Sequence, residues 1–253
     1  MPLQKILSHS FDTNIWSIGY WGSIDKPKLW IETKDQTKHA WFGMDLSSDA
    51  QKPFDIPNPT QKNLVWLCGL EEIGVFLRLQ SGKNPGIEAV EAYSLSCGQR
   101  LYEILIQQRH QQQNEYLLVN LDVNTKVWID LRDGKFVDAP KASSHPILEA
   151  QASQHFEESQ PGFKEFQLFF DLHFSKKIVK GLDYWEGADK LIFSYYLYDS
   201  GLKNIISVTD KAFNILHEDV LAEGDGMGYQ TFQVFQNQLI YIKHKHQLER
   251  YVI

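Results

Sequence analysis

The stretch that decides the fold spans residues 63–130 and reads NLVWLCGLEEIGVFLRLQSGKNPGIEAVEAYSLSCGQRLYEILIQQRHQQQNEYLLVNLDVNTKVWID. Turn residues interrupt its apolar or alternating runs roughly every eight to twelve positions, which is the spacing of consecutive antiparallel strands. Runs of this kind cover 64–67, 75–79, 87–90 and 100–106. Four sequential strands in about 45 residues are the content of one β-propeller blade.

The same spacing continues on both sides of this stretch. Residues 14–20, 28–33, 39–46 and 53–56 predict a first blade. Further strands are expected at 115–121, 126–131, 190–198, 202–208, 211–216, 231–235, 238–243 and 247–253. Residues 3–10 form a short strand candidate that would close the ring by pairing with the last blade, since closure removes an exposed sheet edge.

Three segments fit this pattern less well. Residues 107–114 are polar and predict an exposed hairpin loop. Residues 147–156 fit either a strand or a helical turn. Residues 163–174 fit a helix that places Phe163, Phe166, Phe170 and Phe174 near one face, but the surrounding pattern favours a strand.

The whole pattern predicts an all-β protein, with one domain over residues 1–253. We expect roughly eighteen to twenty strands, which suits an irregular β-propeller of five or six blades. A pair of packed antiparallel sheets is the alternative.

One segment, GIEAVEAYSLSCGQRLYEI, resembles a strand–turn–strand motif of quinoprotein-like β-propellers. The matching residues are Gly86, Ile87, Ala89, Glu91, Gly98, Leu101, Tyr102 and Glu103. The turn differs, because Glu91 and Cys97-Gly98 stand where the family has an Asp and a Thr-Gly. The chain also resembles a bacterial family of similar length and unknown activity that shares Phe11, Ile15 and Trp16. The resemblance implies a propeller, also related in architecture to WD40 proteins, and it implies no quinone or other cofactor.

Composition argues against several function classes. The chain has 253 residues, is 43% hydrophobic and carries a net charge of −7. A protein that grips a phosphate backbone needs a basic face, and no basic run stands out, so we expect no nucleic-acid partner. No apolar run approaches the length needed to span a bilayer, and the first thirty residues show no signal-peptide pattern. We therefore expect a cytoplasmic protein with no membrane partner.

Known catalytic and metal-binding patterns are missing from the sequence. It contains no Gly-x-Ser-x-Gly, no Walker-type loop, no Cys-x-x-Cys and no His-Glu-x-x-His. His244 and His246 lie between lysines and predict a solvated strand end rather than a metal site. Cys68 and Cys97 could be free thiols or could form a disulfide with each other, and we favour free thiols. We predict no metal, no cofactor and no catalytic residue.

Three residues are candidates for contact with a ligand or partner. Trp21 and Trp185 lie near glycines in segments read as loops, and an exposed aromatic at a loop rim is a common anchor of contacts. Asp225 lies in the glycine-rich segment 223–228, which is better read as a turn than as a calcium loop.

Two hypotheses about function follow. The favoured one is a non-catalytic binding or interaction module whose partner is a protein or a small ligand. The alternative is an enzyme or small-ligand binder with a site built from several blade loops at a central funnel. An apolar rim containing Trp21 or Trp185 would favour the first, and a cluster of histidines and carboxylates would favour the second.

Overall fold

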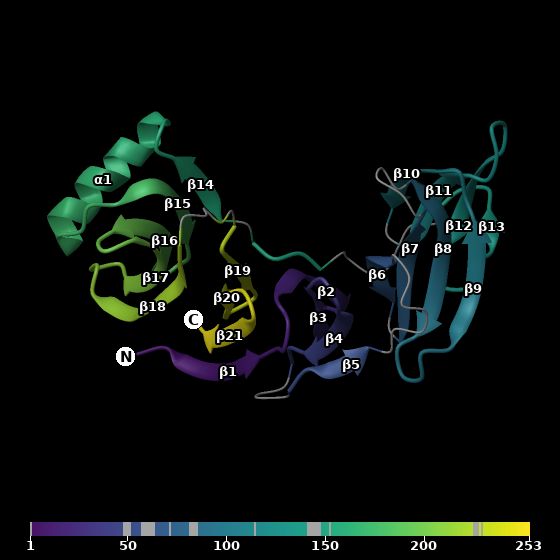
Figure 1. Ribbon diagram of the computed structural model, residues 1–253, viewed down its shortest axis with the longest axis horizontal. Coiled ribbons are helices and arrows are strands. Elements are labelled where there is room, and N and C mark those ends of the chain that lie inside the picture. Colours follow the sequence, from purple (N-terminus) through teal and green to yellow (C-terminus); the bar gives the residue numbers. More distant parts are fainter. Residues whose placement is uncertain are drawn as a thin grey trace. The chain divides into compact units, whose positions relative to one another are not determined.

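The computed structural model describes residues 2–47, 52–56, 64–70, 72–80, 86–113, 115–140, 148–151, 153–224, 228 and 230–253. These residues form twenty-one strands, one helix and five antiparallel sheets (Figure 1). Every sheet consists of consecutive strands, as in propeller blades, except that the first strand joins the last sheet. The predicted all-β class is confirmed, as is a set of five blades, and the alternative of two packed sheets is wrong.

The chain divides into two compact units. We call Trp16–Glu149 the central unit, and Met1–Ile15 with Ala150–Ile253 the terminal unit. Each unit is described by itself. The single domain expected over residues 1–253 stays a prediction.

The central unit holds three four-stranded sheets. The first contains β2 (Ile15–Ser23), β3 (Lys26–Lys34), β4 (His39–Asp45) and β5 (Phe54–Ile56). The second contains β6 (Leu64–Leu70), β7 (Ile73–Leu79), β8 (Ile87–Ser94) and β9 (Arg100–Leu105). The third contains β10 (Gln108–Gln113), β11 (Tyr116–Asn120), β12 (Lys126–Asp130) and β13 (Phe136–Val137).

The terminal unit holds two sheets and the helix. The five-stranded sheet contains β14 (Gln154–Glu157), β15 (Val179–Glu186), β16 (Lys190–Tyr198), β17 (Leu202–Asp210) and β18 (Ile215–Glu223). The other sheet contains β19 (Phe232–Phe235), β20 (Gln238–Lys243), β21 (Gln247–Val252) and β1 (Gln4–Ser10). Helix α1 (Pro161–Phe174) separates β14 from β15.

The first strand completes the last sheet, as the sequence predicted, while closure of the sheets into a ring stays a prediction. Strand β1 runs antiparallel to β21, and Gln4 lies opposite Val252 while Ser10 lies opposite Gln247. Glu249 strengthens the pairing, because its carboxylate accepts a hydrogen bond from the Ser8 hydroxyl at 2.7 Å. The pairing covers an edge of β21 that would otherwise expose unpaired backbone groups.

The expectation of a strand at 163–174 was wrong. Pro161 starts α1 with a fixed φ, and Ser175 ends it in the left-handed region at φ 53°. Phenylalanines at 163, 166, 170 and 174 follow the helical period, so they share the face that packs on the five-stranded sheet. Packing on this sheet stabilises the helix over a strand. The strand pattern of the neighbouring sequence did not indicate that packing.

Two other segments also differ from the sequence interpretation. Residues 108–113 were expected to be a loop but form β10, whose polar side chains suit an edge strand. The strand expected from residue 211 begins only at Ile215, because residues 211–214 form a turn. Of the ambiguous segment 147–156, residues 154–156 belong to β14.

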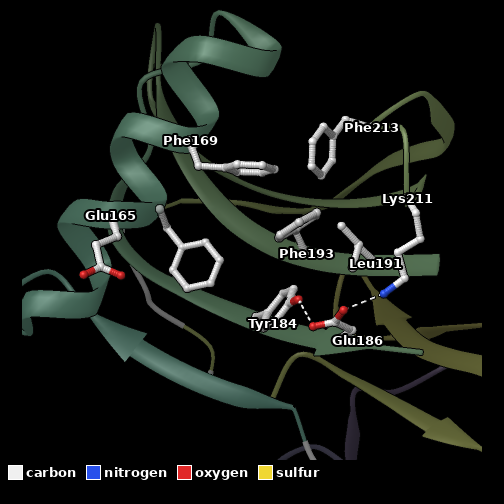
Figure 2. A pocket seen from close by; sticks show the side chains of 9 residues that line it. Glu165, Phe169, Tyr184, Glu186, Leu191, Phe193, Lys211 and Phe213 are labelled. Atoms are coloured by element: carbon white, nitrogen blue, oxygen red, sulfur yellow. Dashed lines mark hydrogen bonds and ion pairs between the residues drawn. The ribbon is translucent and has the colours of Figure 1, made fainter. Parts of the chain in front are cut away.

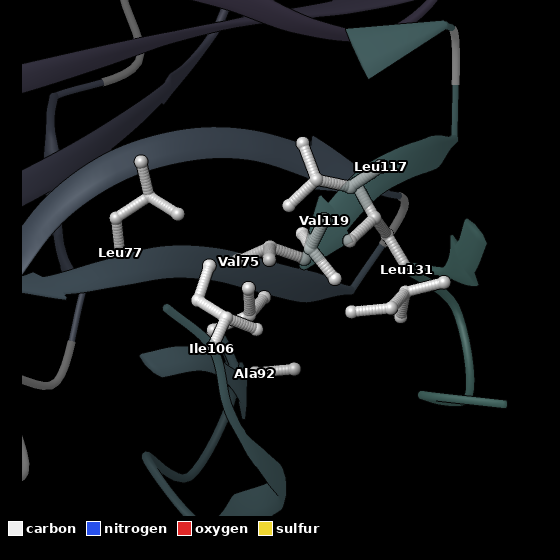
Figure 3. Close-up of a cluster of buried hydrophobic side chains, with 9 residues drawn as sticks. Val75, Leu77, Ala92, Ile106, Leu117, Val119 and Leu131 are labelled. Atoms are coloured by element: carbon white, nitrogen blue, oxygen red, sulfur yellow. The ribbon is translucent and has the colours of Figure 1, made fainter. Parts of the chain in front are cut away.

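Aliphatic side chains fill the space between the second and third sheets of the central unit (Figure 3). The cluster consists of Val75, Leu77, Val90, Ala92, Ile106, Leu117, Val119, Ile129 and Leu131. Seven of them, including Leu117 and Val119, are 0% exposed. The two sheets therefore seal each other's faces.

Aromatic side chains fill the space between the first and second sheets. Trp21 and Trp66 lie 5.7 Å apart, and Phe76 packs edge-on against Trp66. A Cβ on Gly69 would lie 2.5 Å from the Trp21 ring, so only glycine leaves room for it. Trp21 is 3% exposed, and the expectation that it lies exposed in a loop was wrong. It shares the inward face of β2 with Ile15, which is an even number of positions away.

Within the described part of the chain, no helix is long and apolar enough to cross a bilayer. Cys68 and Cys97 are both free thiols. Burial raises the pKa of the Cys68 thiol to about 12.

Candidate functional site

A groove opens between helix α1 and one face of the five-stranded sheet (Figure 2). Its volume is about 400 Å³, which lies within the range of small-molecule sites. Helix α1 contributes Glu165, Phe166 and Phe169 to the wall. We call this feature the aromatic groove.

The floor of the aromatic groove follows from strand alternation. Tyr184 on β15 lies opposite Phe193 on β16, and Glu186 lies opposite Leu191, so all four side chains share one face. The Tyr184 and Phe193 rings stack at 5.3 Å with 29° between their planes. Trp185 points to the other face of the sheet.

A turn between β17 and β18 supplies the remaining side of the groove. Phe213 sits in this turn with φ 65°, a conformation that a non-glycine residue adopts only when its surroundings hold it. The Asp210 carboxylate holds it by accepting hydrogen bonds from the backbone N–H groups of Ala212 and Asn214, both at 2.9 Å. The Phe213 ring thereby packs edge-on against Phe169 at 5.0 Å.

An ion pair lies at the rim of the groove. Lys211 donates to one oxygen of Glu186 at 2.5 Å, and the Tyr184 hydroxyl donates to the other at 2.7 Å. The hydrogen bond from Lys211, followed by that from Tyr184, lowers the pKa of Glu186. Burial, with the Glu186 carboxylate nearby, raises the pKa of Tyr184. Glu186 is thus charged and Tyr184 is protonated at neutral pH.

A polar cluster fastens the end of α1 to the sheet. Lys176 donates to the Tyr195 hydroxyl at 2.8 Å and forms an ion pair with Glu218. The same Glu218 carboxylate accepts hydrogen bonds from Tyr195 at 2.9 Å and Ser207 at 2.7 Å. Burial acts to raise the pKa of Glu218, but the hydrogen bonds from Lys176 and Ser207 leave it below its usual value. This cluster holds the helix wall in place.

A second polar cluster lies on the opposite face of the five-stranded sheet. His155 Nδ1 lies 2.7 Å from Asp183, which also accepts hydrogen bonds from the Thr231 N–H and hydroxyl groups, both at 2.9 Å. The Thr231 hydroxyl oxygen also lies 2.6 Å from the Ser194 hydroxyl oxygen. Because Asp183 is 3% exposed, this cluster fastens the segment before β19 to the sheet.

The structure does not bring the three predicted contact residues together. Trp21 is buried in the central unit. The expectation that Trp185 lies in a loop was wrong, because it belongs to strand β15 and is half-buried. Its indole N–H donates to Gln151 at 2.9 Å. Asp225 lies outside the described residues. The roles of Trp21, Trp185 and Asp225 in ligand or partner contact stay predictions. Trp16, on the same strand as Trp21, is 71% exposed.

The sequence interpretation missed the aromatic groove. The available signal was the helical spacing of Phe163, Phe166 and Phe170, next to the tyrosine and glutamate that flank Trp185. Among the described residues, no group of three or more His, Cys, Asp or Glu side chains is placed to hold a metal ion.

Comparisons with known proteins do not identify a function for this chain, so its function has to be argued from the groove. No family model and no curated protein matches the chain. It is similar to the solved structure of BamB from Moraxella catarrhalis, with 11% identity, 92% of this chain and 71% of that chain covered, and a TM-score of 0.24. It is also similar to the solved structure of a putative glycoside hydrolase from Parabacteroides distasonis, with 9% identity, 100% of this chain and 92% of that chain covered, and a TM-score of 0.31. A third similar structure is the WD40 β-propeller domain of Doa1, with 6% identity, 98% of this chain and 96% of that chain covered, and a TM-score of 0.22. We base no inference about function on TM-scores this low.

Proposed function

We propose that this protein is a non-catalytic binding module that captures an apolar or aromatic group in the aromatic groove. The observation that carries the proposal is the concentration of rings in an open groove. Phe166, Phe169, Tyr184, Phe193 and Phe213 all line it. Ligand sites are typically concave, mostly apolar and equipped with a few polar groups, as this groove is.

The groove is formed before any ligand binds. Its floor belongs to a hydrogen-bonded sheet, and Glu218 fixes the C-terminal end of the helix wall through Lys176. Asp210 fixes the turn that carries Phe213. A preformed site avoids the ordering cost that weakens binding by flexible segments.

The protonation states at the rim favour binding over catalysis. A general acid or base works best with a pKa near the operating pH. Glu186 and Tyr184 are shifted the opposite way, since the pKa of the carboxyl is lowered and that of the phenol is raised. These two groups would bind and orient a ligand rather than exchange protons with it.

The test is a titration of the ¹⁵N-labelled protein with indole, a neutral aromatic probe, followed by NMR chemical shifts. We expect saturable shifts in residues 211–214 and in α1, with a Kd on the order of 1 mM for a ligand of this size. Phe213→Ala should weaken binding at least fivefold, and Phe169→Leu, which removes a ring but keeps apolar bulk, should weaken it less.

Leu168→Ala is the matched control, because Leu168 lies on α1 but is 73% exposed and does not line the groove. It should bind indole like the wild type. The proposal would fail if indole caused no saturable shift, or if Leu168→Ala weakened binding as much as Phe213→Ala in proteins with folded spectra.

A further inference from the structure

The rings of the aromatic groove lack a cation, although rings elsewhere in this protein have one. Lysine ammonium groups lie over Tyr195 at 5.3 Å, over Trp21 at 5.8 Å and over Trp16 at 5.9 Å. Among the described residues, no lysine or arginine lies over a ring that lines the groove. The Phe193 ring is buried, but the rings of Phe166, Phe169, Tyr184 and Phe213 are partly exposed. These partly exposed rings can contact an external cation.

The charges at the groove also favour a cation. Its charged lining residues are Glu165, Glu186 and Lys211, so carboxylates outnumber ammonium groups by two to one. Glu186 is paired with Lys211, whereas no cation pairs with Glu165 among the described residues. The whole chain carries a net charge of −7, which attracts cations and repels anions.

Lys211 itself occupies the position where a ligand cation would meet Glu186. Its ammonium group lies 2.5 Å from that carboxylate, and its side chain remains 39% exposed (Figure 2). A carboxylate has about four lone-pair sites, and Glu186 uses two of them, for Lys211 and Tyr184. Glu186 can therefore accept a further donor or attract a further cation, in competition with Lys211.

From this combination we infer that the groove binds a small organic cation, an alkylated ammonium compound whose apolar substituents contact the rings while its charge is balanced by Glu186. Aromatic rings combined with a carboxylate are the general means of holding such groups, which are too weakly hydrated to need many hydrogen bonds. The volume of about 400 Å³ accommodates the ammonium head together with an attached chain. This inference rests on the proposed function and adds the charge of the ligand.

The experiment compares choline with its neutral isostere 3,3-dimethylbutan-1-ol, which replaces the charged nitrogen with carbon. Both are titrated into the wild-type protein at constant ionic strength and followed by NMR shifts of residues 211–214 and α1. We expect choline to bind at least fivefold more tightly than the alcohol. Equal binding, or tighter binding of the alcohol, would overturn the inference and leave the proposed function standing.

Two rim variants make the test sharper. Glu186→Gln keeps the shape of the side chain and should weaken choline binding about fivefold without affecting the alcohol. Lys211→Gln removes the competitor and should strengthen choline binding severalfold, again without affecting the alcohol. A loss of choline binding in Lys211→Gln would contradict the inference. Lys164→Gln, an exposed lysine of α1 outside the groove, is the control and should change neither affinity.

The outcomes separate this inference from the proposed function. If choline, the alcohol and indole all fail to bind, then the groove is not a binding site and both fall. Sedimentation with phosphatidylcholine vesicles tests the source of the cation. We expect free choline to bind and the vesicles to leave the protein in solution, and co-sedimentation would overturn the assignment to a small molecule.

Discussion

The faces of two sheets are covered in different ways. In the central unit the sheet β6–β9 packs against the sheet β10–β13, and their contact is aliphatic and fully buried. In the terminal unit one face of β14–β18 is covered by a single helix of 14 residues. A helix is about 10 Å wide, whereas nine-residue strands such as β16 and β17 are about 30 Å long. The sheet seals its partner, and the helix leaves part of its sheet open.

The packing of the side chains differs between the sheet that is covered by another sheet and the sheet that is covered by a helix. Leu117 and Val119 interdigitate with residues of a matching sheet, so the space between the sheets is filled. Phe193 packs against Phe169 and Phe170 of α1 and is buried, whereas Tyr184 is only half-buried. Large rings from the helix and the sheet therefore border a groove instead of filling it. The groove that we propose as a binding site lies where the covering element is narrower than the sheet.

The largest expected effect concerns the two tryptophans of β2. Trp21→Ala removes a ring that is 3% exposed and should reduce the free energy of unfolding by about 4 kcal/mol. Trp16→Ala, at a side chain that is 71% exposed, should cost less than about 1 kcal/mol. Urea unfolding followed by circular dichroism measures both. Similar losses in the two variants would contradict the assignment of Trp21 to the core.

The next prediction contrasts the sealed interface with the groove. Leu117→Ala should reduce the free energy of unfolding by about 3 kcal/mol, because it opens a cavity among fully buried neighbours. Phe213→Ala should cost only about 1 kcal/mol, because that ring already borders open space. The same urea experiment applies. A loss at Phe213 as large as that at Leu117 would mean that the groove is part of a sealed core.

The smallest effect tests how α1 is held. Glu218→Gln weakens the bonds to Lys176 and Ser207 and should cost about 1 kcal/mol at pH 7, a figure reduced for screening because the carboxylate is 37% exposed. Since the folded pKa of Glu218 is lowered, its contribution is fully present above the unfolded value of about 4.3 and is lost as pH falls through the folded value.

Thermal unfolding between pH 7 and pH 3 measures this contribution. The difference between wild type and Glu218→Gln should shrink below about pH 4, as the wild-type carboxylate becomes protonated. Glu165→Gln, whose carboxylate has no cation partner among the described residues, should show no such difference. A difference that stayed constant down to pH 3 would contradict the role given to Glu218.

Much of the sheet pattern could be predicted from the sequence, because it depends on local alternation. The strands around Trp66, Phe76 and Tyr93 each show apolar runs bounded by turn residues, and the pairing of β1 with β21 follows from the need to cover an edge. The helix could not be chosen over a strand from Phe163, Phe166 and Phe170 alone, because the sheet that selects it lies elsewhere in the chain.

The groove was beyond prediction for a related reason. Glu186 and Lys211 are 25 positions apart, and only the register of β15, β16 and β17 brings them together. Trp21 shows the opposite case. Its spacing from Ile15 already placed it on the inward face, but the neighbouring glycine suggested a loop instead.

The most direct test of the groove as a binding site is the measurement of intermolecular nuclear Overhauser effects between indole and the protein. Binding in the groove predicts contacts from the indole protons to the ring protons of Phe169, Phe193 and Phe213. Contacts to the exposed rings of Trp16 or Tyr198 instead, or no contacts at saturating indole, would contradict the central claim that the incompletely covered sheet of the terminal unit forms the site.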